Sequence, residues 1–105
     1  MTEPTRIRAV LQGDLVDVRM RLTHDMEMGR RKDVDGKLVP AWFVQRLTVT
    51  HNGRTVFVAQ CGPMISKNPQ FNFRFTGGKP GERIVVSWVD NRGEQRSDEA
   101  VIAQG

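Results

Sequence analysis

The chain has 105 residues and a mass of 11.9 kDa, which suits one domain with a single modest core. Hydrophobic residues make up 38%, and no apolar run approaches the ~20 residues that cross a bilayer, so we expect a globular protein without a membrane-spanning segment. The formal net charge of +4 comes from basic residues spread from Arg6 to Arg96, which disfavours a nucleic-acid partner and favours an acidic protein partner.

Apolar and polar residues alternate along most of the chain, whereas the 3.6-residue spacing of a helix is nearly missing. Val16, Val18 and Met20 are separated by charged residues, as in a strand with one buried face. The three phenylalanines of residues 71–75 repeat this alternation, and we expect their rings to anchor the core. The pattern predicts about seven strands, at Ile7–Leu11, Leu15–Leu22, Phe43–Thr50, Arg54–Cys61, Phe71–Thr76, Arg83–Asp90 and Glu99–Ala103.

Two turn signals locate hairpins between these strands. Asn52-Gly53 joins the third strand to the fourth, because both residues tolerate the positive φ of a tight turn. Asn91-Arg92-Gly93 joins the strand that contains Trp88 to the last strand. Short strands separated by turns at this spacing predict an all-β fold, an immunoglobulin-like β-sandwich of about seven strands that occupies residues 1–105 as one domain.

The segment Thr23–Ala41 departs from this pattern. It is long, polar and charged for a connection between strands, although Asp35-Gly36 is a signal for a small hairpin within it. Loops beyond ~12–15 residues in compact domains are usually functional or disordered. We therefore expect a functional site, if the chain has one, to involve this loop.

Catalytic chemistry finds little support in the sequence. Cys61 is the one cysteine, and His51 lies near the opposite end of the paired strands, roughly 20–30 Å away at ~3.3 Å per residue. Free cysteines are usually buried, so we expect a structural thiol. The nucleophile elbow, the Rossmann glycines and the HExxH motif are all absent. We predict that the protein is not an enzyme and holds no cofactor.

A metal site is an alternative interpretation of the long loop. His24, Met26 and Met28 are spaced so that an extended segment would place them on one face. Imidazole and thioether ligands suit soft copper, which leaves open a small periplasmic copper- or ligand-binding sandwich that uses these three residues. No second histidine lies at motif spacing, so our main prediction includes no metal.

Apolar residues on both faces of a strand suggest a covered outer surface. Trp42 and Phe43 are adjacent, so in a strand they point to opposite faces. Val85 and Val89 similarly lie opposite the apolar alternation that includes Trp88. The outer faces of a sandwich are normally polar, and aromatic residues are enriched where proteins dock. We therefore predict a partner interface that includes Trp42, Phe43, Val85 and Val89.

Several groups of residues, in order along the chain, resemble the SoxZ family of sulfur-oxidation proteins. They are His24-x-Met26-Glu27-x-Gly29-x-Arg31-Lys32-Asp33-x-x-Gly36-Lys37-x-x-Pro40, Asn52-Gly53-x-x-Val56-Phe57, Ile65-Ser66-x-Asn68-Pro69-x-Phe71-x-Phe73 and Val86-x-Trp88-x-Asp90-x-x-Gly93. The resemblance extends from about Ile7 to Ala103.

This resemblance implies a non-catalytic subunit that pairs with SoxY as a heterodimer or larger complex. The C-terminal Gly-Gly-Cys-Gly-Gly arm of SoxY carries sulfur intermediates during thiosulfate oxidation, and the pair contacts the sulfur-oxidation enzymes only transiently. Cys61 lacks glycines on both sides, so nothing transfers the carrier role to it. The resemblance also implies that the Thr23–Ala41 loop and the Ile65–Pro69 segment shape the surface presented to SoxY or to the enzymes.

The cellular location follows from the same resemblance. The segment Met1–Arg6 does not show the charged start and apolar stretch of a secretory signal. SoxZ proteins work in the periplasm, where they arrive folded on a signal-bearing SoxY. We therefore expect a periplasmic protein that is exported with its partner.

Overall fold

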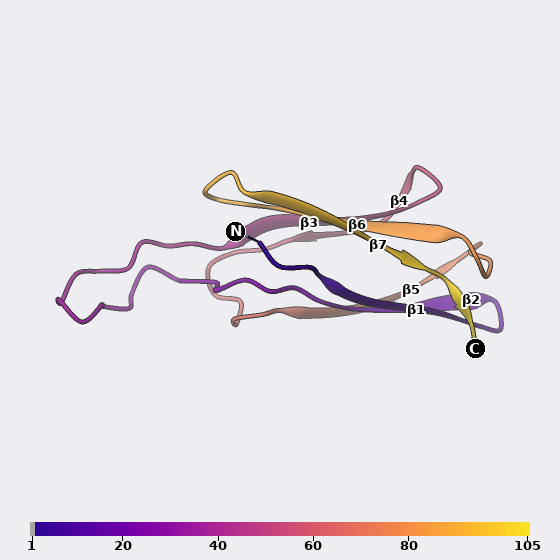
Figure 1. Ribbon diagram of the computed structural model, residues 1–105, viewed down its shortest axis with the longest axis horizontal. Coiled ribbons are helices and arrows are strands. Elements are labelled where there is room, and N and C mark those ends of the chain that lie inside the picture. Colours follow the sequence, from indigo (N-terminus) through magenta and orange to yellow (C-terminus); the bar gives the residue numbers. More distant parts are fainter. Residues whose placement is uncertain (1) are drawn as a thin grey trace.

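Alternating apolar residues build two four-stranded β-sheets that pack face to face in the computed structural model, which describes residues 2–105 (Figure 1). The strands are β1 (Arg6–Gln12), β2 (Leu15–Arg21), β3 (Val44–His51), β4 (Arg54–Gln60), β5 (Gln70–Thr76), β6 (Arg83–Asp90), β7 (Gln95–Val101) and β8 (Ala103–Gln104). One sheet has the order β5-β2-β1-β8 and the other β4-β3-β6-β7. The predicted all-β sandwich is confirmed, with a short eighth strand in addition.

The connectivity is that of an immunoglobulin-like sandwich. Neighbours in sequence form the hairpins β1–β2, β3–β4 and β6–β7, while β2 pairs with the distant β5 and β3 with the distant β6. Asn52 and Gly53 have φ values of 50° and 78°, which confirms the tight turn predicted between β3 and β4. Within residues 2–105 no helix is long and apolar enough to cross a membrane.

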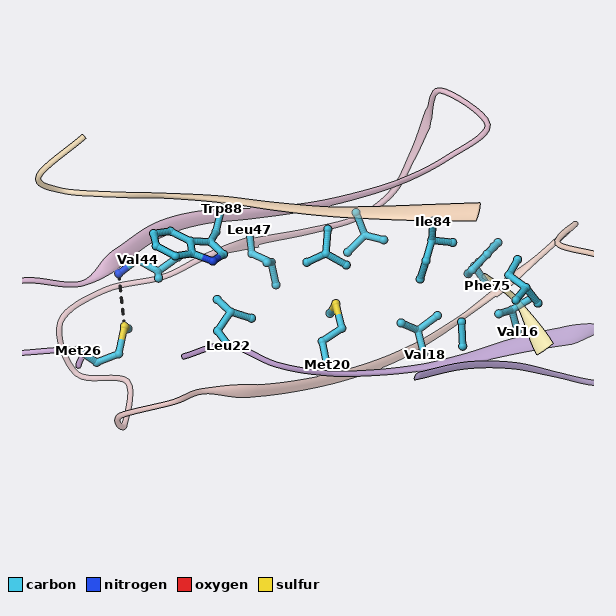
Figure 2. Packing of buried hydrophobic residues seen from close by; sticks show 14 residues of the cluster. Val16, Val18, Met20, Leu22, Met26, Val44, Leu47, Phe75, Ile84 and Trp88 are labelled. Carbon is cyan, nitrogen blue, oxygen red and sulfur yellow. Dashed lines mark hydrogen bonds between the residues drawn. The ribbon is translucent and has the colours of Figure 1, made fainter. Parts of the chain in front are cut away.

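The core lies between the two sheets and uses the inward residues of the central strands (Figure 2). Val18 and Met20 of β2 face Leu47 of β3 and Ile84 of β6, and all four are at most 1% exposed. Burying one such side chain stabilises the fold by about 1.5–3 kcal/mol. The outward residues of the same strands are polar or half-buried, as the period-two alternation requires, except for Leu15 of β2, which is 37% exposed.

The phenylalanines of β5 contribute less to the core than their spacing predicts. Phe75 is buried, whereas Phe71 and Phe73 are half-buried because β5 lies at the edge of its sheet. Phe57 stacks on Phe73 with ring centroids 4.5 Å apart. These rings therefore close one side of the sandwich instead of anchoring its centre.

The C-terminal strand also differs from the prediction at Glu99–Ala103. Pairing with β6 begins at Gln95, and the chain then leaves β7 at Ile102 to pair in parallel with β1 through β8. The side chain of Ile102 is 1% exposed, so it joins the core at the crossing between the sheets. Residues 95–99 are all polar, and edge strands of this kind carry no apolar alternation.

The molecule is elongated, with dimensions of 53 × 21 × 21 Å. Its Cα radius of gyration is 15.6 Å, against about 13 Å for a compact domain of this length. Figure 1 shows the reason: the chain between β2 and β3 runs out from one end of the sandwich along the long axis and returns. We call this segment, residues 23–41, the arm.

Candidate functional site

The arm is an irregular two-stranded projection, not a disordered loop. Near its base, the amides of Glu27 and Trp42 each donate to the carbonyl of the other, at 2.6 and 2.8 Å. Further out, Val39 N–H donates to the Arg31 carbonyl at 2.7 Å. These hydrogen bonds give N–H and C=O groups of the arm backbone partners within the arm itself, so the arm does not need the sandwich to supply them.

The tip of the arm is a compact turn built on Asp33. Its Oδ1 accepts the amides of Asp35 and Lys37 at 2.9 and 3.0 Å, and its own amide donates to the Lys37 carbonyl at 2.8 Å. Gly36 has φ +79°, a conformation that favours glycine. Val34 is fully exposed at this tip. The Asp-x-Asp-Gly sequence therefore closes a turn that presents an apolar side chain to solvent.

Glu27 and Arg31 form an ion pair on the side of the arm. The Arg31 Nη2 donates to Glu27 Oε1 at 2.8 Å, and its Nε donates to the same oxygen at 3.1 Å. The hydrogen bond from Arg31 lowers the pKa of Glu27 and raises that of Arg31. Pairs this exposed contribute little to stability, so this one chiefly orients the side chains.

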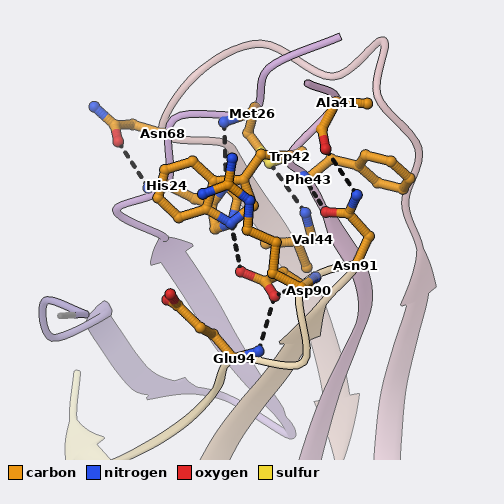
Figure 3. Close-up of polar contacts among 11 residues, drawn as sticks. His24, Met26, Ala41, Trp42, Phe43, Val44, Asn68, Asp90, Asn91 and Glu94 are labelled. Carbon is orange, nitrogen blue, oxygen red and sulfur yellow. Dashed lines mark hydrogen bonds and ion pairs between the residues drawn. The ribbon is translucent and has the colours of Figure 1, made fainter. Parts of the chain in front are cut away.

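The arm is tied to the sandwich by a buried histidine (Figure 3). The side chain of His24 is 2% exposed, and its Nδ1 accepts the backbone amide of Met26 at 3.0 Å. The ring nitrogen Nε2 therefore carries the proton and donates to Asp90 Oδ2 at 3.1 Å. His24 thus acts as a neutral hydrogen-bonding link between the arm and the end of β6.

Asp90 is the acceptor at the centre of this cluster. In addition to His24, Trp42 Nε1 donates to Oδ2 at 2.8 Å, and the amides of Arg92 and Glu94 donate to Oδ1 at 2.9 Å each. Burial raises the pKa of Asp90, but the hydrogen bonds from Trp42, His24, Glu94 and Arg92 outweigh it and leave the pKa below its usual value. We call His24, Trp42 and Asp90 the arm-base cluster.

Three other residues of the predicted loops complete the attachment of the arm. Met26 has a positive φ of 51° and is buried, and its sulfur accepts the Val44 amide at 3.3 Å. Asn68 exchanges hydrogen bonds with the backbone of His24, and Pro69 is buried next to it and accepts the Leu22 amide. Met26, Asn68 and Pro69 therefore help His24 to hold the arm in position.

Of the remaining predicted loop residues, Gly29 lies where the two sides of the arm meet, and Pro40 and Ser66 lie on the surface. Gly29 has φ +83°, and a Cβ added there would lie 3.3 Å from Ala41 Cβ, so the two sides of the arm approach closely at this point. Pro40 and Ser66 are exposed. Surface positions of this kind are available to a partner without being required by the fold.

The copper alternative loses its support in this geometry. Both ring nitrogens of His24 are engaged in hydrogen bonds, and the Met26 sulfur is buried against Val44. Met28 is 44% exposed. Because Met26 has a positive φ, the segment is not extended there, and the three side chains do not share one face.

The four residues of the predicted interface lie on β6 and immediately before the start of β3. Val85 and Val89 are half-buried on the outer face of the β4-β3-β6-β7 sheet. Trp42 belongs to the arm-base cluster, where the Arg92 guanidinium lies 4.3 Å from its ring. Phe43 is half-buried against the edge of the core. The Asn91 amide donates to the Phe43 carbonyl at 3.0 Å, so Phe43 lies beside the end of β6 that carries Val89.

Neither histidine of the chain activates Cys61. The thiol is half-buried, and burial raises its pKa. His51 pairs instead with Glu82 at 2.9 Å, and His24 is held by Asp90. A buried thiol with a raised pKa is a poor nucleophile at neutral pH, as expected for a structural cysteine.

The sequence identifies Asp90 only as part of a family motif and Asn91 only as part of a turn, and it assigns neither of them a role at this site. The amide and Oδ1 of Asn91 bond to the carbonyl and amide of Phe43, so they hold the end of the arm to the β6–β7 turn. The alternation Ile84, Val86, Trp88 places Asp90 on the buried face of β6. An acidic residue at an inward position is the signal that could have identified it.

Comparisons with known proteins give a family and a fold. The family model described as "Sulphur oxidation protein SoxZ" matches residues 5–101. No curated protein sequence matches the chain. Among solved structures, a superoxide reductase (neelaredoxin) from Ignicoccus hospitalis has a TM-score of 0.63 at 11% sequence identity, covering 99% of this chain and 82% of that one. A likeness at this identity shows a shared fold alone.

Proposed function

Because this chain belongs to the SoxZ family and so has a role in the sulfur-oxidation system, we propose that it is the non-catalytic subunit that binds a SoxY-type carrier. In this role it supports the cysteine-bound sulfur intermediates of its partner during thiosulfate oxidation. The observation that best supports a partner-binding role is the composition of the outer face of the β4-β3-β6-β7 sheet. The opposed residues at the centre of this face, Val58, Thr48 and Ser87, are uncharged.

The register of the strands builds an uncharged strip on this face. Thr48 of β3 lies opposite Ser87 of β6 on one side and Val58 of β4 on the other, and Thr50 lies opposite Val85. We define the valine strip as Thr48, Thr50, Val58, Val85, Ser87 and Val89. Residues directly opposite each other in antiparallel strands point to the same face, so these six side chains form one surface.

Charged residues surround the valine strip instead of interrupting it. Arg46 lies opposite Val89 at one end, and the Arg83–Glu99 pair, at 3.3 Å, lies at the other. An uncharged centre with a polar rim is the usual composition of a protein–protein interface. Val85 and Val89 are therefore retained as interface residues of the proposal, with Val58, 41% exposed, beside them.

The arm supplies the second part of the proposed surface. It projects beyond the sheets, and its exposed apolar side chains, Met28, Val34 and Leu38, lack contacts that would bury them within the chain. A rigid base and an exposed tip suit a segment that reaches over a partner. We propose that the arm contacts the SoxY-type subunit or the enzymes that this subunit visits. We propose that this chain and the SoxY-type subunit form a heterodimer that works in the periplasm. The signal-bearing partner would carry this chain there during export.

Light scattering on a sizing column tests the proposal with the full chain and a SoxY-type subunit. A single peak at the summed mass is expected. Replacing Val85 with Glu puts a carboxylate within the valine strip, directly opposite Glu99. It should weaken the complex by about 2 kcal/mol or more, which is roughly 30-fold in Kd. Two separate peaks for the unmodified proteins would overturn the proposal.

Leu15→Glu provides the matched control. Leu15 is 37% exposed and lies on the outer face of the other sheet, so this variant adds the same charge away from the valine strip. Its affinity for the SoxY-type subunit should stay within about twofold of the unmodified chain. Equal weakening by both variants would show that net charge, and not the valine strip, controls binding.

A further inference from the structure

The outer face of the β5-β2-β1-β8 sheet carries a cluster of arginines that the linear sequence hides. The strands of this sheet place five exposed arginines on the face, namely Arg6, Arg8, Arg19, Arg21 and Arg74. The same strands contain one acidic residue, Asp17. We call this surface the arginine face. It lies on the opposite side of the sandwich from the valine strip.

The strand register brings like charges directly opposite each other. Arg6 pairs with Arg21 and Arg8 with Arg19 across β1 and β2. Side chains in such positions have Cβ atoms about 4.5–5.5 Å apart, and like charges there destabilise a sheet. Within residues 2–105, the one ion pair that these arginines form is Arg19–Asp17, at 3.7 Å. The fold therefore keeps an arrangement that works against its own stability.

Shallow hollows follow the arginines across the face. One hollow is lined by the apolar residues Ile7 and Met20 and by Arg6, Arg8, Arg19, Arg21 and Gln70. A second continues onto β5, where Arg19, Arg74 and Asn72 line it together with Asp17 and Phe73. Guanidinium groups bind carboxylates through two parallel hydrogen bonds, so hollows lined by several of them suit the side chains of Asp and Glu.

We propose that the arginine face docks an acidic protein surface. The positive charge of this face would complement an acidic surface, because five cations are gathered over three adjacent strands with a single carboxylate among them. All five cations are arginines, which are enriched at protein interfaces, whereas lysines are depleted there.

The composition of the face disfavours other anionic partners. Single-stranded nucleic acids are held by exposed aromatic rings, and none of the three phenylalanines of β5 is exposed. Membrane-surface binding uses several exposed bulky apolar residues among the basic ones. This face carries one, Leu15, and the residues between the paired arginines in sequence, Ile7 and Met20, face inward. An acidic protein needs neither feature, since paired guanidiniums are sufficient to bind its carboxylates.

A peptide of ten glutamates serves as the probe for this proposal. Titrated into the isotope-labelled full chain at low salt, the peptide should shift the amide resonances of β1, β2 and β5 and leave those of β4 and β7 unchanged. Binding should weaken steeply as salt is added, because exposed charges are screened. Shifts spread evenly over all basic residues would overturn the proposal.

Two double variants with equal charge changes make the test specific. Arg8→Gln with Arg19→Gln removes a facing pair from the arginine face and should weaken peptide binding about tenfold. Arg54→Gln with Lys79→Gln removes the same charge from the exposed positions Arg54 and Lys79, outside this face, and should change binding less than about twofold. Equal losses in the two variants would mean that only overall charge attracts the peptide.

Thermal unfolding separates a functional role for the arginines from a structural one. Because Arg8 and Arg19 repel each other, the double variant that neutralises them should unfold at the same or a higher temperature than the unmodified chain. A clear fall in its unfolding temperature would assign the arginines to folding instead. Tighter binding of a single-stranded oligonucleotide, or of phosphatidylglycerol vesicles, at the same face would also overturn the proposal of a protein partner.

This inference stands apart from the proposed function. Charge removal at Arg8 and Arg19 should leave the affinity for a SoxY-type subunit unchanged, because the valine strip lies on the other sheet. Conversely, Val85→Glu should leave the glutamate peptide bound as before. The two experiments can therefore contradict the arginine-face proposal and the SoxY-binding proposal independently of each other.

Discussion

At the scale of single residues, the carboxylate of Asp90 connects parts of the chain that are far apart in sequence. It accepts hydrogen bonds from His24 and Trp42, at the two ends of the arm, and from the turn that follows β6. A charge this deeply buried is unfavourable unless donors surround it. Here four donors do so, and the position of the arm depends on them.

Replacing Asp90 with Ala should therefore destabilise the protein strongly. The change leaves the Nε atoms of Trp42 and His24 and two backbone amides without acceptors, and each unsatisfied buried group costs about 1–3 kcal/mol. We expect a loss of at least ~3 kcal/mol in the free energy of unfolding, measured with urea. Asp35→Ala, at the exposed tip of the arm, is the control and should change it by less than ~0.5 kcal/mol.

Glu82 gives a pH dependence with a defined sign. Hydrogen bonds from Asn52, His51 and the Lys79 amide lower its pKa to about 2. A carboxylate whose pKa is lower in the folded state stabilises the fold above its unfolded pKa of about 4.3. That contribution is lost as the pH falls from about 4 toward 2.

Unfolding free energies measured from pH 6 to pH 2 check this expectation. Glu82→Gln removes the titrating group, so its stability should fall less over this range than that of the unmodified chain. Glu3→Gln, at an exposed site, is the control and should follow the unmodified curve. Parallel curves for the protein and the Glu82 variant would contradict the prediction.

At the scale of elements, the arm is an addition to the sandwich and not a part of its core. Every residue from 30 to 38 is exposed, and the described hydrogen bonds of this stretch connect the arm to itself. Contacts with the sandwich begin at the arm-base cluster. The fold should therefore tolerate a shorter arm, provided that His24, Met26 and Trp42 are kept.

Replacing residues 30–40 with a short Gly-Asn-Gly linker tests this division. The paired Glu27 and Trp42 are retained, so the free energy of unfolding should change by less than about 1 kcal/mol. If the arm reaches over the SoxY-type subunit, the same variant should bind that subunit at least about tenfold more weakly. Unchanged affinity, measured by calorimetry, would remove the arm from the proposed interface.

The strands were largely predictable from the sequence because alternation reports local burial. β2, β3, β4 and β6 lie within a residue or two of their expected bounds, since each has an apolar face toward the core. β7 was misplaced because its exposed edge needs no apolar residues.

The candidate sites were less predictable, since they depend on which strands pair and in which register. Arg8 and Arg19 are separated by the β1–β2 turn, and only pairing makes them neighbours. His24 and Asp90 are likewise distant in sequence, and only the packing of the arm on the end of β6 brings them together. The basic residues are therefore scattered along the sequence, but strand pairing brings five of the arginines together on one face of the folded sheet.

At the scale of the whole molecule, the two sheets present opposite surfaces to the surroundings. One outer face is uncharged along its centre, and the other carries five arginines. The arm extends from one end of the sandwich, along the long axis of 53 Å. A molecule with this arrangement has room for two partners, because binding at one face does not cover the other.

Simultaneous binding is therefore the prediction that tests the whole arrangement. With the SoxY-type subunit present in saturating amount, the glutamate peptide should bind with an affinity within about twofold of that for the free chain, since sites without shared contacts act independently. Fluorescence anisotropy of a labelled peptide measures this directly. The Arg8 and Arg19 double variant in the same complex should lose the signal, which shows that the peptide does not sit on the partner. Displacement of the peptide by the partner would instead place the SoxY-type subunit on the arginine face.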